Sequence, residues 1–91
     1  MPNFVMVMMG SAAEGDWGAY IDRLIASGKF LGGSSLGNGV SVTKGGDDPK
    51  CAITGYMRFS AQSLEEVRRL VEGNPLYEAG GHVELLEEVL D

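Results

Sequence analysis

The chain has little positive charge. Its 91 residues carry 7 lysines and arginines against 13 aspartates and glutamates, which gives a net charge of −6. The basic residues are scattered along the sequence, whereas binding to a phosphate backbone requires basic residues clustered on one surface. We therefore expect no nucleic-acid partner.

Long apolar runs and paired cysteines are also missing. No apolar stretch approaches the roughly 18 residues of a membrane span. The first residues, Met1–Phe4, lack a basic leader followed by a long apolar stretch. The single cysteine, Cys51, has no partner for an internal disulfide. These features predict a protein without a membrane segment, located in the cytoplasm.

Glycine, by contrast, is abundant. The 14 glycines predict several special turns or close approaches of the backbone, because glycine carries a high conformational entropy cost. A length of 91 residues predicts one domain, spanning residues 1–91, with one modest core. A chain this small and rich in glycine is a candidate for stabilisation by self-association.

The first half of the chain shows a strand pattern followed by a helix pattern. Residues Asn3 to Met9 form an almost continuous apolar run, which is typical of a strand buried on both faces. From about Ala13 to Ser27 the apolar residues follow a helical period, and Gly28 suits the left-handed position after the helix. The helical stripe consists of Trp17, Tyr20, Ile21, Leu24 and Ile25. Glu14 and Asp16 fall in its first turn, where negative charge is favourable.

The stretch between residues 30 and 50 has the weakest pattern. Val40–Thr43 alternates between apolar and polar residues and predicts a half-exposed strand. Gly32–Leu36 either begins that strand or forms a bent edge before it. Gly45–Pro49 has the composition of a turn or mobile loop.

The second half repeats the order of strand, helix and strand. Ala52 to Ser60 predicts a strand, and Ser63 with Glu66 forms a capping box at the start of a helix that runs to about Glu72. Gly73-Asn74-Pro75 ends this helix, because the residue before a proline avoids the helical conformation. Leu76–Glu78 has room for a short turn, and His82 to Leu90 predicts the last strand.

This order, β-α-β-β-α-β, predicts an α+β ferredoxin-like sandwich with an antiparallel sheet and both helices on one face. The first strand is apolar on both sides, so the face without helices also carries apolar residues. Such a patch is unfavourable on a monomer. We therefore expect a homodimer in which a second copy covers this face around a two-fold axis, as a dimeric α+β barrel.

The sequence also resembles the YCII-related and DGPF-type domain family. The similarity is strongest from Gly55 to Val89, through a strand ending in Ser60-Ala61-Gln62-Ser63, a short helix, the Asn74-Pro75 stop and Gly80-Gly81-His82-Val83-Glu84. The segment from Ala26 to Gly33 is similar more loosely. The resemblance implies the same dimeric barrel fold.

Some members of this family are thought to use a histidine at the start of the first helix and an aspartate before the proline. Trp17 or Gly18 stands at the first position here, and Asn74 at the second. An asparagine cannot transfer protons as a carboxylate does. Gly45–Lys50 resembles the loop of the DGPF branch only faintly. We therefore expect no chemistry that depends on the histidine–aspartate pair.

Five polar residues are the candidates for ligand binding. On the predicted strands, Arg58 and Tyr56 share one face, where they would hold an anionic or carbonyl-bearing molecule, unless Arg58 pairs with a glutamate across the sheet. His82 is the only histidine, and Glu84 lies two residues away on the same strand face. The full candidate set is Tyr56, Arg58, Asn74, His82 and Glu84. His82 and Glu84 alone supply too few ligands for a metal, so we expect no metal site.

Two classes of function follow. The first is a small dimeric barrel that binds or transforms a small polar or anionic metabolite in a cleft. The alternative is a non-catalytic dimerisation or interaction domain. The sequence indicates no cofactor and identifies neither a reaction nor a catalytic residue.

Overall fold

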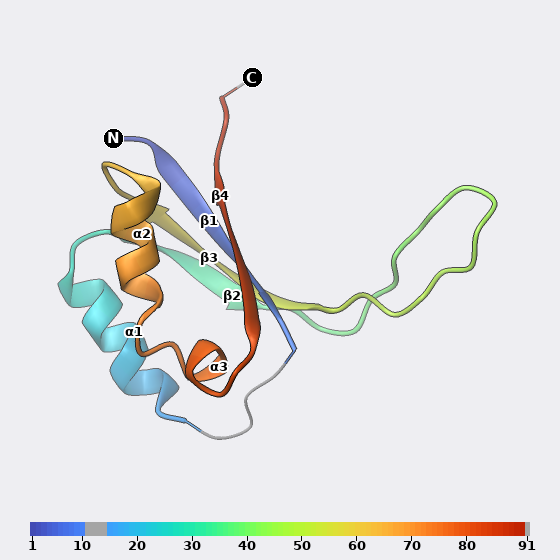
Figure 1. Cartoon of the computed structure of the whole chain (residues 1–91), viewed down its shortest axis with the longest axis horizontal. Helices are drawn as coiled ribbons and strands as arrows, with labels where there is room; N and C mark the ends of the chain where they lie inside the picture. The colour runs from blue at the N-terminus through green and yellow to red at the C-terminus, as the bar shows by residue number, and fades with distance from the viewer. Residues whose placement is uncertain (11–14, 91) are drawn as a thin grey trace.

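The structure is a computed structural model that describes residues 1–10 and 15–90. It is a small α+β fold in which a four-stranded antiparallel sheet has helices packed against it (Figure 1). The strand order in the sheet is β2-β3-β1-β4. In chain order the elements are β1 (Asn3–Met9), α1 (Trp17–Ala26), β2 (Phe30–Ser35), β3 (Ile53–Ser60), α2 (Leu64–Val71), α3 (Pro75–Glu78) and β4 (His82–Glu87).

β1 lies in the middle of the sheet and divides its side chains between two environments. It pairs with β3 on one side and with β4 on the other, both antiparallel. Phe4, Met6 and Met8 are buried. The alternate residues Val5 and Val7 are only partly buried. The apolar run therefore supplies one strand face to the core and leaves the other on the opposite side of the sheet, as its pattern predicts.

The core lies between the sheet and the helices. Tyr20 and Leu24 from α1 and Val67 and Val71 from α2 are buried with the side chains from β1 and β3. Phe30 of β2 packs on Phe59 of β3, with ring centroids 5.8 Å apart. These contacts place the helices on one face of the sheet.

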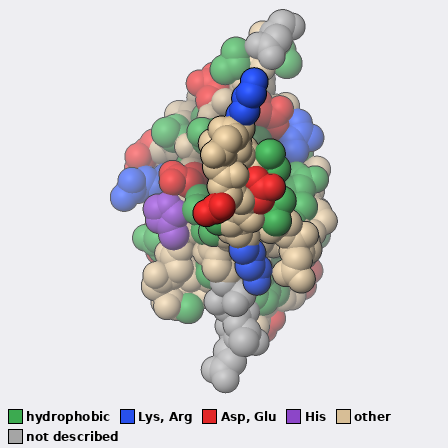
Figure 2. Space-filling view, turned by 90° about the vertical axis from the view of Figure 1, so that its right-hand side faces the viewer, with side chains coloured by type: hydrophobic (Ala, Val, Ile, Leu, Met, Phe, Trp, Pro, Cys, Tyr) green, Lys and Arg blue, Asp and Glu red, His purple; other side chains and the backbone are tan. Residues whose placement is uncertain are grey.

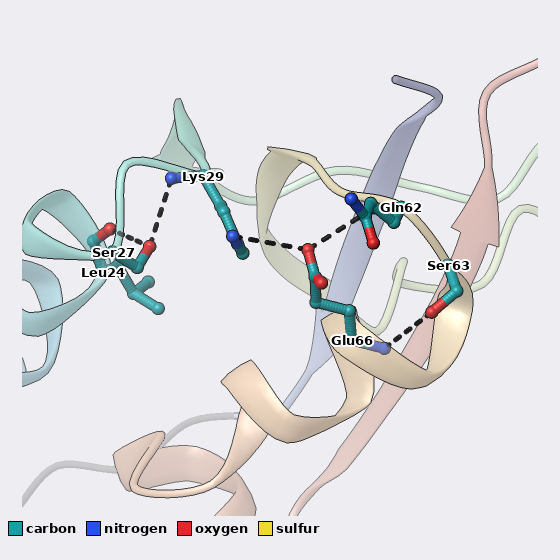
Figure 3. A network of polar contacts seen from close by, with 6 residues as sticks. All are labelled: Leu24, Ser27, Lys29, Gln62, Ser63 and Glu66. Atoms are coloured by element: carbon teal, nitrogen blue, oxygen red, sulfur yellow. Dashed lines mark hydrogen bonds and ion pairs between the residues drawn. The ribbon is translucent and has the colours of Figure 1, made fainter.

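Helix α2 begins as its sequence predicts. The Ser63 hydroxyl accepts a hydrogen bond from the Glu66 amide at 3.2 Å, so Ser63 is the N-cap. The Glu66 carboxylate reaches back to the amide of Gln62 at 3.4 Å and lies 3.5 Å from Lys29 Nζ (Figure 3). The carboxylate therefore ties the start of α2 to the segment that follows α1.

The segment after α1 is ordered by a second local network. The Ser27 hydroxyl donates to the Leu24 carbonyl and accepts from the Lys29 amide at 3.2 Å (Figure 3). Gly28 has φ +74°, a conformation that favours glycine, so the left-handed turn predicted there is confirmed. Together these contacts turn the chain from α1 into β2.

The residues between β2 and β3 form a projecting arm, which we define as residues 36–52 (Figure 1). A few backbone contacts hold its two limbs together, including an isolated bridge between Val40 and Lys50. The predicted strand at Val40–Thr43 is therefore wrong. The second strand of the sheet is Phe30–Ser35, because Phe30 can pack on Phe59 whereas Val40 and Val42 lie beyond the sheet, 57% and 78% exposed.

Several element ends differ from the predicted ones. β4 ends at Glu87 rather than Leu90, and Val89, beyond the end of the strand, is exposed. β3 begins at Ile53 instead of Ala52. Helix α1 begins at Trp17, where Asp16 acts as N-cap by accepting from the Ala19 amide at 2.9 Å. The predicted role of Glu14 lies outside the described residues.

Within residues 1–10 and 15–90, no helix has the length and apolar character needed to cross a membrane.

Candidate functional site

A cavity of about 560 Å³ lies between α1 and the β2–β3 end of the sheet. Its volume lies within the range that is usual for small-molecule sites. Apolar side chains from five elements line it: Met8, Trp17, Ile21, Phe30, Met57 and Leu76. A mostly apolar lining favours burial of an apolar ligand surface.

The polar part of the lining is made of hydroxyl-bearing residues and exposed backbone. Ser34, Ser35, Thr54 and Tyr56 border the cavity, together with Gly10, Gly32 and Gly33. The Thr54 hydroxyl is engaged with the carbonyls of Met8 and Gly10. Among the described lining residues none carries a full charge at neutral pH.

Gly33 allows β2 to approach β3 closely beside the cavity. A Cβ atom at this position would collide with the Tyr56 carbonyl oxygen and lie 2.9 Å from the Cα atom of Met57. Because these are backbone atoms, they cannot move aside as a flexible side chain does. Gly33 is therefore required for the shape of this wall.

Asn74, a predicted site residue, is fully buried and has a structural role. Its Oδ1 atom accepts from the Tyr77 amide at 3.1 Å, which caps α3, and its Nδ2 atom lies 3.8 Å from the Met8 sulfur. Nearby, the Tyr20 hydroxyl donates to the Leu70 carbonyl at 2.7 Å, and burial raises the pKa of Tyr20. These groups hold α1, α2 and α3 together behind the cavity.

The other four predicted site residues share the sheet face opposite the helices, which we call the open face. Tyr56 and Arg58 alternate with the buried residues Met57 and Phe59. Paired residues form two rows across this face. One row is Ser34, Tyr56, Val7 and Glu84, and the other is Gly32, Arg58, Val5 and Leu86.

Arg58 forms an ion pair with Glu88, as the structural alternative in the sequence analysis proposed. Its Nε atom lies 2.6 Å from Oε1 and its Nη2 atom 3.2 Å from Oε2 of the carboxylate. The hydrogen bond from Arg58 lowers the pKa of Glu88, and the bond to Glu88 raises the pKa of Arg58. This two-point contact occupies the guanidinium edge with which Arg58 would hold an anion.

His82 and Glu84 form a second pair at the start of β4. The His82 Nε2 atom lies 2.9 Å from the Glu84 Oε1 atom, and both side chains are more than half exposed. The histidine is visible on the surface in Figure 2, where it is purple. No cluster of three or more potential metal ligands occurs among the described residues. The pair therefore has the geometry of a surface contact.

The structure does not bring the five predicted residues into one pocket. Only Tyr56 borders the cavity, while Arg58, His82 and Glu84 form their two pairs on the open face and Asn74 is in the core. The spacing of Trp17 and Ile21 predicts a core stripe and does not mark them as cavity residues. No local pattern in the sequence shows that a space remains in front of them.

A more open hollow of similar size, about 630 Å³, lies between the start of α1 and α3. Its charged residues already have partners within the protein. Arg23 is bonded to the Glu72 carbonyl and its guanidinium carbon lies 5.4 Å from the centre of the Tyr20 ring, while Glu78 accepts from the Gly73 amide at 3.1 Å. These contacts stabilise the helix ends and leave the cavity as the stronger candidate site.

Comparison of the chain with models of known protein families, with curated proteins and with solved structures gives no match.

Proposed function

We propose that this chain is a small-molecule-binding domain whose site is the cavity between α1 and the β2–β3 end of the sheet. The observation that carries this proposal is the combination of volume and lining. A space of about 560 Å³ is bordered by two aromatic and four aliphatic or thioether side chains. Pockets that hold drug-sized or metabolite-sized molecules have this character.

The lining favours a neutral, mostly apolar ligand. Trp17 and Phe30 offer aromatic surfaces for a ring, and the Ser35 hydroxyl and the glycine backbone offer a few hydrogen bonds. The Ser34 hydroxyl donates to the Ser35 carbonyl. An anionic ligand would need a compensating cation, and Arg58 is paired with Glu88 on the other face. The ligand that we propose is therefore a neutral ring compound with one or two polar groups, in place of the polar or anionic metabolite expected from the sequence.

We further propose that the domain is a homodimer with a ferredoxin-like, YCII-related fold. The strand order β2-β3-β1-β4, with the helices on one face, supports the ferredoxin-like arrangement. Val5 and Val7 on the open face, with Leu86 beside them at 53% exposed, support burial of this face against a second copy.

Trp17 provides a direct test, because it is the only tryptophan and it lines the cavity. Neutral ring-containing metabolites would be screened by thermal shift and then titrated while the fluorescence of Trp17 is followed. A binding compound should raise the unfolding temperature and change this fluorescence.

A matched pair of variants locates the site. Ile21→Phe adds volume inside the cavity, whereas Ile25→Phe adds the same groups on the same helix at a side chain that is 60% exposed and outside the lining. We expect weaker binding by Ile21→Phe and unchanged binding by Ile25→Phe, with both folded by circular dichroism. Equal affinities, or no binder in the screen, would contradict the proposal.

The second candidate is a domain whose function is assembly alone. The apolar part of the open face favours this second candidate. Such a surface is buried by a partner whether or not a ligand is present. A stable dimer by light scattering that binds none of the screened compounds would support this candidate over the first.

A further inference from the structure

The cavity reaches the outer edge of the sheet. Four consecutive residues of β2, Gly32 to Ser35, border it. Successive residues of a strand point to opposite faces, so a cavity that touches all four extends over the strand's backbone. β2 is the outermost strand, and on this side the sheet has no further strand among the described residues. The cavity therefore opens beside a free strand edge.

The outer edge of β2 exposes backbone N–H and C=O groups, and the strand has no charged side chain that would discourage another strand from pairing there. The Leu36 amide donates to the Thr54 carbonyl, so by the alternation of an antiparallel ladder Ser35 and Gly33 direct their N–H and C=O groups outward. The Ser35 carbonyl accepts one hydrogen bond, from the Ser34 hydroxyl, and keeps a second lone pair for another donor. No residue in Phe30–Ser35 is charged. The opposite edge strand, β4, carries Glu84 and Glu87, and such charges discourage pairing with another strand.

The arm presents a second free edge of the same kind. The Ser41 amide donates to the Pro49 carbonyl at 2.7 Å, and the Cys51 amide to the Gly39 carbonyl at 2.9 Å. Val40, between these two inward-facing residues, must direct its N–H and C=O groups away from the other limb. Its side chain and that of Val42, two residues on, lie on one side of the limb and are exposed.

We propose that residues 39–43 in the arm of a second copy pair with the free edge of β2 and form the missing wall of the cavity. This inference rests on the proposed function, since the wall belongs to the proposed ligand site. Val40 and Val42 would cover the mouth of the cavity beside Trp17 and Ile21, and the backbone groups of Val40 or of Val42 would pair with those of Ser35 in an antiparallel ladder.

The arm that pairs with β2 cannot be the chain's own, so the proposal assigns it to a second copy. Residues 39–43 follow β2 after only three residues, and the Val40–Lys50 bridge keeps them in line with the strand that they would have to pair with. A chain cannot reverse there and keep that bridge. Residues 37–43 and Phe30–Ser35 carry no charge, although the chain has a net charge of −6. The two segments can therefore pair without repulsion between like charges, which favours a second copy as the partner.

Disulfide trapping tests the contact. In a Cys51→Ser background, one preparation carries Val42→Cys and a second, tagged preparation carries Ser35→Cys. A disulfide requires Cα atoms about 5.5 Å apart, which directly opposed residues on paired strands satisfy. We expect mixing under mild oxidation to give the tagged heterodimer, with Val40→Cys tested in the same way because the register can place either valine opposite Ser35.

The matched control mixes Val42→Cys with Leu86→Cys, which is exposed but lies on β4. It should give several-fold less heterodimer. Equal trapping in the two mixtures, or none with either valine, would overturn the proposal. Val7→Asp is expected to disrupt the open-face dimer. Trapping that persists in a Val7→Asp background would therefore show that the arm contact does not depend on the open-face dimer.

A second measurement connects the arm to the cavity. For a compound that changes Trp17 fluorescence, Val42→Lys should weaken binding several-fold, whereas Thr43→Lys, on the other side of the limb, should leave it unchanged. Equal effects of the two lysines would contradict a wall built from Val42. Specific trapping in the absence of any bound compound would keep the arm contact and contradict the ligand proposal alone.

Discussion

The two faces of β1 both carry apolar side chains, but the two sets of side chains have different roles. Phe4, Met6 and Met8 are buried under the helices, and Met6 is 0% exposed. Val5 and Val7 alternate with them and are only partly buried on the open face. Hydrophobicity alone does not distinguish the two sets. The difference lies in whether the same chain supplies the covering elements.

The largest expected effect is on the helix-covered face. Met6→Asp would bury a carboxylate without a partner among apolar side chains, and we expect a loss of about 4 kcal/mol or more. A domain of ordinary stability would then be largely unfolded. Urea unfolding followed by circular dichroism measures the change, and a stable folded variant would mean that this face is not the core.

The neighbouring residue on the open face should respond differently. Val7→Asp leaves the helix-covered core intact, so in a Val42→Lys background, which removes the proposed arm contact, we expect a folded chain by circular dichroism that has lost its dimer by light scattering. Val7→Ala is the control that removes apolar surface without adding charge. If Val7→Asp unfolds the chain as Met6→Asp does, or if it stays dimeric, the comparison between the two faces fails.

The buried side chain of Asn74, behind the cavity, should contribute to stability through the cap of α3. Asn74→Ala removes the cap of α3 and leaves the Tyr77 amide without its acceptor, at an expected loss of about 1–3 kcal/mol. Thermal unfolding measures the loss. Asn74→Ser keeps an acceptor oxygen that is favoured at an N-cap, adds no charge, and serves as the control for the cap. Full stability of Asn74→Ala would exclude a structural role for this side chain.

A smaller effect is expected at the start of α2. Ser63→Ala removes one hydrogen bond to the Glu66 amide and should cost about 1 kcal/mol, the usual value for an N-cap. Urea unfolding of Ser63→Ala beside Gln62→Ala, a neighbour whose side chain is not the cap, checks this value. An unchanged midpoint for Ser63→Ala would contradict the assigned helix start.

The smallest effect belongs to the Arg58–Glu88 pair, since both side chains are partly exposed. A lowered carboxylate pKa stabilises the folded state above the ordinary glutamate pKa of 4.5, and this contribution is lost as the pH falls through the lowered pKa. Glu88→Gln should therefore be slightly less stable than the unmodified chain at pH 7, and this difference should shrink as the pH falls below 4.5. A difference that grows toward acid would contradict the ion pair.

The elements with strong local signals could be predicted from the sequence. Ser63 and Glu66 mark the start of α2, Gly28 marks the end of α1, and the run from Asn3 to Met9 gives β1 with its boundaries. The second strand could not be placed. Val40–Thr43 has the better strand pattern, but Phe30–Ser35 has a partner for its aromatic ring, and tertiary packing outweighs local preference.

The candidate site illustrates the same limit. Trp17 and Ile21 have the period of a core helix, and no local pattern shows that space remains in front of them. Arg58 and Tyr56 share a face in both the prediction and the structure, but the position of Glu88 beside Arg58 depends on β4 returning to pair with β1.

The sequence by itself determined the alternation of β1, the helix caps, the glycine turns and the excess of negative charge, because each depends on residues close together in the chain. Only the tertiary structure decided which strand edge is free, where the cavity opens and which polar residues pair. Those features arise when segments distant in sequence pack together, and their contact energies are absent from any local pattern.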